Sequence, residues 1–149
     1  MKIQEKDLFH GAALTQIVEH KSFKALNVAS PKYGHYLVNT DREVFVKYRK
    51  SARAPFIFTF QPEEVRALYD ALTTVPLPGQ VILCLVCGQT TVCALSSMEF
   101  SRVLDLSNPP VQQSVRVDIP SGGSCHVSGT KGQLKRAVTH NSFPDKVFT

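Results

Sequence analysis

The sequence predicts an α+β fold: a single domain over residues 1–149, with about seven strands in a mostly antiparallel sheet and three to four helices. Two observations lead to this fold class. Segments typical of β-strands follow one another along 35–60 with no helical segment between them, which favours hairpins over β-α-β units. Segments with helical periodicity then separate the later pairs of strands. The expected order is α-β-β-β-α-β-β-α-β-β-α.

The first half of the chain is expected to contain one helix and three strands. The helix covers about 7–20, with Asp7 as its N-cap and apolar residues at helical spacing behind it. After a polar loop, strands are expected at 35–39, 43–49 and 56–60. The second of these strands alternates. One face carries Val44, Val46 and Tyr48, and the other carries Glu43, Phe45, Lys47 and Arg49.

The middle of the chain gives the clearest helical signal, at 62–72. Pro62 suits the first helical position, and apolar residues follow at spacings of three, four and seven. Prolines at 76 and 78 are expected to end this helix. The continuous apolar run 81–87 is typical of a central strand that is covered on both faces, and 91–95 is expected to pair with it as a hairpin.

The last third is expected to hold a helix, a hairpin and a short helix. Ser96 and Glu99 have the spacing of a capping box, which predicts a helix start. The segments 115–119 and 124–128 flank a Pro-Ser-Gly-Gly turn, and 134–138 has helical spacing. We expect one core to collect the apolar residues of these elements: Val65, Leu68, Leu72, Val81, Leu83, Leu85, Phe100 and Leu104.

The four cysteines are expected to be buried, reduced thiols. Cys84 and Cys87 have the spacing of a zinc or redox pair, but residues three apart on a strand point to opposite faces, so the two thiols cannot share a metal. No disulfide, metal or cofactor is therefore expected. The longest apolar stretch is far shorter than the roughly 20 residues of a membrane span, and the N-terminus does not look like a signal peptide. We expect a cytoplasmic protein.

The charge pattern supplies the candidate binding residues. The formal net charge is +5 and the predicted pI is about 9.1, which is compatible with a polyanionic partner. Cations concentrate around the loop that follows the strand 43–49, next to aromatic residues, as in surfaces that bind single-stranded nucleic acid. A further lysine lies in a Gly-Thr-Lys-Gly turn, where backbone N–H groups attract anions. The candidate residues are Lys47, Arg49, Lys50, Arg53 and Lys131.

These observations favour a non-catalytic binding module for nucleic acid or another polyanionic partner, such as an acidic protein surface. The common motifs of phosphate-binding loops, dinucleotide sites and zinc proteases are absent from the sequence. The sequence does not predict the oligomeric state. A protein–protein adaptor that presents a sheet edge is one alternative.

A metal-dependent nuclease is the other alternative. The order helix, three strands, helix, strand over 7–87 is similar to the core of restriction-endonuclease-like nucleases. That resemblance implies a divalent metal held by an Asp, a Glu-x-Lys pair and often a helical Glu. Here Asp41, Glu43 and Lys47 share one strand face and Glu19 lies on the first helix. Glu43 and Lys47 are four residues apart, however, and not two as in a Glu-x-Lys pair.

Overall fold

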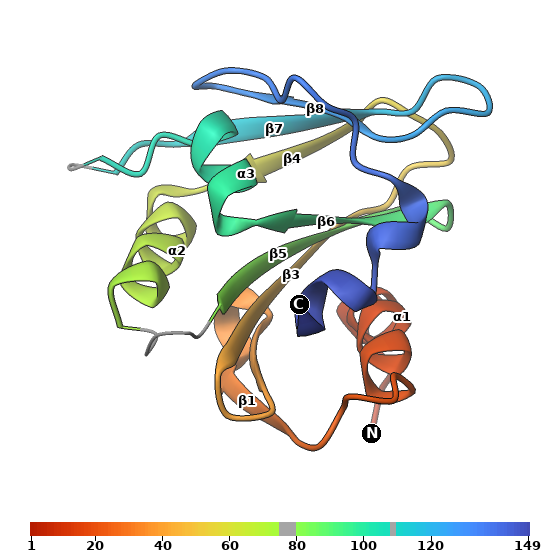
Figure 1. Ribbon diagram of the computed structural model, residues 1–149, viewed down its shortest axis with the longest axis vertical. Coiled ribbons are helices and arrows are strands. Elements are labelled where there is room, and N and C mark those ends of the chain that lie inside the picture. The colour runs from red at the N-terminus through yellow and green to blue at the C-terminus, as the bar shows by residue number, and fades with distance from the viewer. Residues whose placement is uncertain (75–79, 108–109) are drawn as a thin grey trace.

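Two sheets and two groups of helices make up the computed structural model, which describes residues 1–74, 80–107 and 110–149 (Figure 1). These described residues form eight strands, three α-helices and three short 3-10 helices (η). The elements in chain order are α1 (Glu5–Val18), β1 (Leu26–Ser30), η1 (Pro31–Tyr33), β2 (His35–Val38), β3 (Arg42–Arg49), β4 (Phe56–Phe60), α2 (Pro62–Thr74), β5 (Gln80–Cys87), β6 (Thr91–Ser96), α3 (Ser97–Val103), β7 (Gln113–Asp118), β8 (His126–Gly129), η2 (His140–Ser142) and η3 (Asp145–Phe148).

The strands are divided between a five-stranded sheet, in the order β1-β2-β3-β5-β6, and a three-stranded sheet, in the order β4-β7-β8. The pair β3–β5 is parallel, and every other strand pair is antiparallel. The parallel pair arises because the chain leaves β3, forms β4 in the other sheet and returns through α2, a crossover that parallel strands require. The α+β class and the predicted order of the elements are confirmed, with the strands in two sheets.

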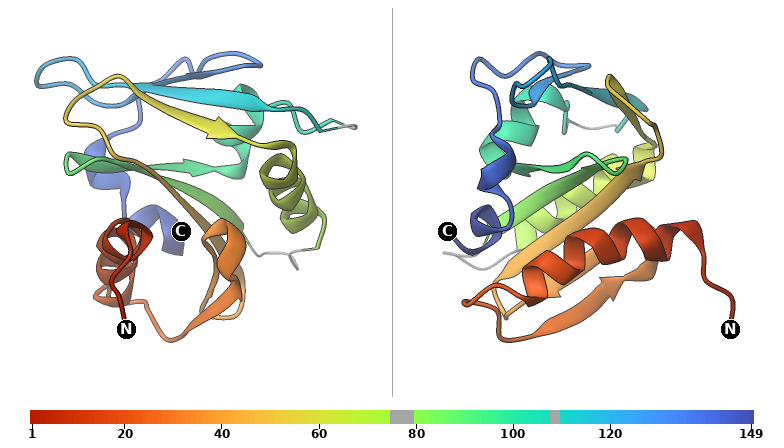
Figure 2. Two further views of the ribbon diagram at one scale, coloured as in Figure 1. Left: turned by 180° about the vertical axis from the view of Figure 1, so that it is seen from behind. Right: turned by 90° about the vertical axis from the view of Figure 1, so that its right-hand side faces the viewer.

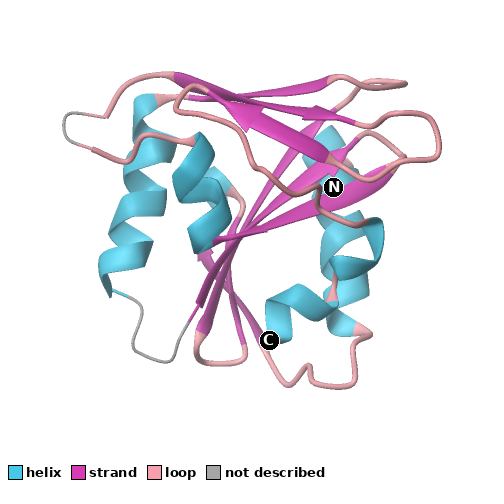
Figure 3. Cartoon of the chain, turned by 45° about the horizontal axis from the view of Figure 1, so that its top comes forward, coloured by secondary structure: helices cyan, strands magenta, loops and turns pink. Residues whose placement is uncertain are grey.

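The five-stranded sheet lies in the middle of the molecule. One of its faces is covered by the three-stranded sheet together with α2 and α3, and the other by α1 and the C-terminal turns η2 and η3 (Figure 2). Figure 3 shows the helices in two groups on either side of the strands. None of the described helices is both long enough and apolar enough to cross a bilayer.

The core between the two sheets is the larger one and confirms the predicted set of residues. Val65 and Leu68 of α2 pack there with Leu83 and Leu85 of β5 and with Phe100 of α3, and Leu72 packs against its margin. Four phenylalanines in this core are almost fully buried: Phe56, Phe58, Phe60 and Phe100. A second cluster lies under α1, where Ala13 and Ile17 contact the valines of β3 and β5.

The alternation of β3 and of the cysteine pair is also confirmed. Phe45 faces the inter-sheet core, whereas Val44 and Val46 face α1. Cys87 lies in the inter-sheet core and Cys84 lies under α1, so their thiols are on opposite faces of β5. All four cysteines are free and buried.

Three local expectations are corrected. Residues 26–30, expected in a loop, form the edge strand β1. The helix at 134–138 does not form, because the N–H and C=O groups of Val138 are hydrogen-bonded to Cys125 in an isolated bridge. Helix α1 begins at Glu5, and the Asp7 carboxylate accepts a hydrogen bond from Gln4 N at 2.8 Å from within the first turn. The prolines expected to end α2 lie outside the described residues.

Candidate functional site

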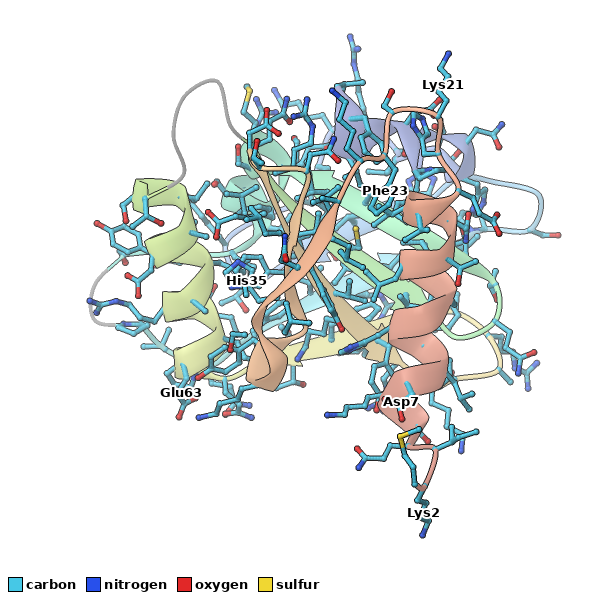
Figure 4. The ribbon with its side chains drawn as sticks, turned by 90° about the horizontal axis from the view of Figure 1, so that it is seen from below. Lys2, Asp7, Lys21, Phe23, His35 and Glu63 are labelled. Atoms are coloured by element: carbon cyan, nitrogen blue, oxygen red, sulfur yellow. The ribbon has the colours of Figure 1, made fainter. Side chains whose placement is uncertain are left out.

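A pocket of about 670 Å³ lies beside the C-terminal half of β3. Its walls come from four parts of the chain that are distant in sequence. We call it the basic pocket; it is lined by Glu5, Lys6 and His10 of α1, by Lys32, Tyr33 and Gly34 at η1, by residues 46–50 at the end of β3, and by Glu64 of α2. Figure 4 shows the first turns of α1 and α2, marked by Asp7 and Glu63, at the same end of the molecule, and His35 further inside, on the strands between the two helices.

The pocket exists because β3 is longer than the strand beside it. The pairing of β2 with β3 ends at His35 opposite Phe45, and one more hydrogen bond joins Val46 N to Gly34 O at 2.9 Å. Among the described strands, none pairs with the rest of β3 along this edge. Alternate residues of a strand direct their backbone groups to the same edge, so the N–H of Tyr48 faces the pocket as that of Val46 faces Gly34.

Glycine at position 34 allows the chain to turn at the pocket wall. Gly34 has a φ of 61°, in the left-handed region that favours glycine. A Cβ atom at this position would also clash with Val46 O and with the His10 ring. The close approach of η1 to α1 and β3, and with it the shape of the basic pocket, therefore depends on this glycine.

The lining of the pocket is strongly positive. It contains the five cationic side chains Lys6, Lys32, Lys47, Arg49 and Lys50, against the two carboxylates Glu5 and Glu64. Lys47 Nζ lies 2.6 Å from Glu64 Oε2, and Lys50 Nζ lies 3.3 Å from Glu5 Oε2. In the part of the chain that the structure describes, the exposed Lys6, Lys32 and Arg49 form no ion pair.

The wall next to α1 is aromatic. The Tyr48 ring stacks on the Phe9 ring, with a centroid distance of 4.8 Å and an interplanar angle of 6°. His10 lies nearly perpendicular to Tyr48 at 5.9 Å, and its Nδ1 is 3.1 Å from the Tyr36 hydroxyl. At η1, Lys32 Nζ is 5.4 Å from the centroid of the Tyr33 ring. The pocket lining thus combines aromatic and cationic side chains.

Burial sets the charge state of the titratable groups on the aromatic wall. Burial and the nearby Lys6 ammonium lower the pKa of His10, and Asp7 only partly opposes them. Burial, followed by the Glu5 carboxylate, raises the pKa of Tyr48. Both shifts favour the neutral form at neutral pH. The positive potential of the pocket therefore comes from its lysines and its arginine.

The structure brings together three of the five residues that the sequence singled out. Lys47, Arg49 and Lys50 line the basic pocket. Arg53 is exposed in the following loop and is not among the lining residues. Lys131 lies in the turn after β8, where its Nζ donates to Ser101 O at 3.1 Å and its N–H donates to Val103 O. It belongs to the α3 side of the molecule.

Sequence reasoning missed the other half of the pocket. Lys6 and His10 are four residues apart and share one face of α1, which was the only local signal. Lys32 and Tyr33 fall in the polar loop that the sequence predicts after the first helix, and they are not among its candidate residues. Their contribution depends on η1 approaching the end of β3, which the sequence pattern does not encode.

The carboxylates of the nuclease alternative are held by separate partners. Asp41 pairs with Arg42 at 2.6 Å, which lowers the pKa of Asp41, and Glu43 lies 2.8 Å from His35 Nε2. Glu19 is exposed at the end of α1. Within the described ranges, no three His, Cys, Asp or Glu residues lie where they could hold a metal ion together.

The buried thiols differ in acidity. Burial raises the pKa of Cys84 and of Cys87 to about 12. A hydrogen bond from Cys93 lowers the pKa of Cys125 to about 7. Cys125 is nevertheless fully buried, so a reagent in solution does not reach its sulfur in the folded state.

The chemistry available in the basic pocket is the binding of anions. Several ammonium groups and one guanidinium surround an open strand edge, and Arg49 can form paired hydrogen bonds to a phosphate. Comparison of the chain with family models, with curated proteins and with solved structures finds no match in any of the three.

Proposed function

We propose that this protein is a non-catalytic binding module for a polyanion, with nucleic acid as the preferred class, and that the basic pocket is its binding site. The observation that carries the proposal is the convergence of five cationic side chains from α1, η1, β3 and the loop after it, against only two carboxylates. Cations that are distant in sequence are held around one opening of about 670 Å³. A phosphate chain in this opening gains attraction from three of its walls: α1, η1 and the end of β3 with the loop after it.

The cations divide into two roles. Lys47 and Lys50 each pair with a carboxylate, which fixes their positions but also screens their charge. Lys6, Lys32 and Arg49 have no such partner among the described residues and are exposed. They supply most of the attraction for a phosphate ligand, because their charge is not compensated within the protein.

The test is a salt titration of binding, read by the fluorescence anisotropy of a labelled oligonucleotide. If three phosphates are neutralised, the slope of log affinity against log salt is about −2 for a single strand and about −3 for a duplex. On a single strand, the double variant Lys32→Ala/Arg49→Ala should make the slope less steep, by between about one and two units. Exposed charges contribute little to stability, so its thermal unfolding should match that of the wild type.

A matched control separates the pocket from the net charge. The double variant Arg53→Ala/Lys131→Ala removes the same charge from outside the basic pocket. It should leave the slope nearly unchanged. Equal losses in the two double variants would show that binding is a general effect of positive charge, and the pocket would lose its role.

A sheet edge supports the adaptor as a second candidate. The strand β1 is at the edge of the five-stranded sheet, and its Val28 is 61% exposed. Exposed edges are templates for strand addition by a partner, although the register shift between Val28 and Ser30 interrupts this one. If no polyanion binds in the titration above, the basic pocket is excluded and this edge becomes the leading site.

A further inference from the structure

The ring of Tyr48 is a prearranged aromatic platform at the wall of the basic pocket. One of its faces is held by Phe9, which is nearly parallel to it at 4.8 Å. Tyr48 lines the pocket, whereas Phe9 is not among the lining residues. Tyr48 thus contacts Phe9 and also faces the pocket.

The neighbours of Tyr48 hold this ring in place. His10 stands at 74° to it, and the His10 ring is in turn hydrogen-bonded to the Tyr36 hydroxyl. The side chain of Tyr48 thus has contacts from two consecutive residues of α1, and its backbone is fixed by pairing with β5. A ring restrained in this way loses little freedom when a ligand stacks on it, which favours binding.

Cations line the same pocket as the platform, and the side chain of Arg49 leaves β3 on the face opposite to Tyr48. Arg49 and Lys50 follow Tyr48 in the chain, and Lys6 lies one helical turn before His10 on α1. The N–H of Tyr48 points to the same open edge of β3. The site therefore offers a flat apolar surface next to several groups that bind phosphate.

This combination matches a nucleotide unit better than a bare polyanion. A base has two π-faces and can continue the stack of Phe9 and Tyr48, while its phosphates contact the surrounding cations. The bases of a duplex are stacked on one another, so their faces are not available to a protein ring. A polyphosphate or an acidic protein segment has no planar ring to place there.

We infer that the basic pocket binds single-stranded nucleic acid, with one base stacked on Tyr48 and the adjacent phosphates on Arg49, Lys50 and Lys6. This rests on the proposed function, because the same cations provide the attraction. Stacking tolerates every base, so the preference is for single strands and not for a sequence.

The test compares three probes of similar length: an oligouridylate, an RNA duplex and inorganic polyphosphate. Tyr48→Leu should weaken binding of the oligouridylate by on the order of tenfold and leave the affinity for polyphosphate unchanged. Tyr48→Phe keeps the ring and should bind the oligouridylate like the wild type. Tyr69→Leu is the matched control, because Tyr69 is 44% exposed on α2 and lies outside the basic pocket.

A second readout does not require the leucine variant to fold. The protein has no tryptophan and four tyrosines, so its own emission reports on tyrosine. A base stacked on Tyr48 should quench part of this emission when the oligouridylate binds, and polyphosphate should not. Tyr48→Phe should remove that part of the quenching while keeping the affinity.

The possible failures are distinguishable. Equal affinities for oligouridylate and polyphosphate, with no quenching in the wild type, would overturn the stacking and leave the polyanion proposal intact. A loss of affinity for all three probes in Tyr48→Leu and in Tyr48→Phe would give Tyr48 a structural role, and would also overturn it. If none of the three probes binds the wild type, the proposed function itself fails.

Discussion

The two faces of the five-stranded sheet are built differently. The face toward the second sheet packs against almost fully buried phenylalanines and leucines, including Phe58, Phe100 and Leu68. On the face toward α1, the fully buried side chains are smaller, such as Ala13 and Ile17 of α1 against the valines of β3, and the phenylalanines there are less completely buried. Large aromatic side chains bury the most apolar area, so the inter-sheet face supplies most of the stability.

The candidate site lies at the margin of the second cluster, beside α1. At the margin of α1, the side chains of His10, Tyr36 and Tyr48 are only partly buried, and two of the three line the basic pocket. Partial burial leaves ring surfaces and charged groups within reach of a ligand, which a dense core does not. The comparison indicates that the inter-sheet face holds the fold together, while the binding groups gather at the free edge of β3, with Tyr48 on the α1 face and Lys47 and Arg49 on the inter-sheet face.

The largest expected effect belongs to the inter-sheet face. Leu68 is 1% exposed in the middle of α2, so Leu68→Ala leaves a cavity among well-packed neighbours. We expect a loss of about 2–5 kcal/mol in the free energy of unfolding, measured by urea denaturation. Met98→Ala, at a position that is 72% exposed on α3, should change it by less than about 0.5 kcal/mol. A similarly small loss for Leu68→Ala would place α2 outside the core.

A smaller effect, with a pH dependence, belongs to the α1 face. Burial and Lys6 lower the pKa of His10 below its usual 6.5, so the folded state favours the neutral ring. Between the folded pKa and 6.5 the unfolded chain binds more protons, and stability should therefore fall as the pH falls through this window. His10→Gln should lose less stability than the wild type between neutral and mildly acidic pH, in urea denaturation at each pH.

Protonation of His10 should strengthen polyanion binding, although it lowers the stability of the fold. A protonated His10 adds a positive charge to the wall of the basic pocket, next to Lys6 and Tyr48. Polyanion affinity should rise as the pH falls, and this rise should be reduced in His10→Gln. A stability difference between wild type and His10→Gln that stays constant with pH would show that the ring does not titrate in this environment.

The fold was predictable where a local pattern also determines the packing. The helix α2 has a clear helical periodicity, and β5 is a short apolar run between turn residues, and the sequence predicts both correctly. The edge strand β1 was missed because it is short: only Leu26 and Val28 alternate with a polar residue, and Val28 is exposed at the sheet edge instead of buried. The spacing at 134–138 fits a helix, but Val138 is held by a backbone bridge to Cys125, a partner that local spacing does not reveal.

The candidate site was only half predictable, for a related reason. Lys47, Arg49 and Lys50 are close together in sequence and appear as a cluster of charge. Lys6 and Lys32 reach the same pocket only because α1 and η1 pack beside the free end of β3. The length difference between β2 and β3 creates that free end, and it is a property of strand pairing that a single sequence does not show.

The smallest expected effect belongs to Lys131, which the sequence placed among the binding candidates. Its ammonium donates to Ser101 O at 3.1 Å and its N–H donates to Val103 O, so the side chain closes the end of α3 instead of facing the basic pocket. Lys131→Ala should change the salt slope of polyanion binding by less than about half a unit, whereas Lys32→Ala should change it by nearly one. The two variants carry the same net charge, so their difference isolates position from charge. An equal change in both slopes would show that the binding surface extends around the molecule to the α3 side. Binding would then not be confined to the basic pocket.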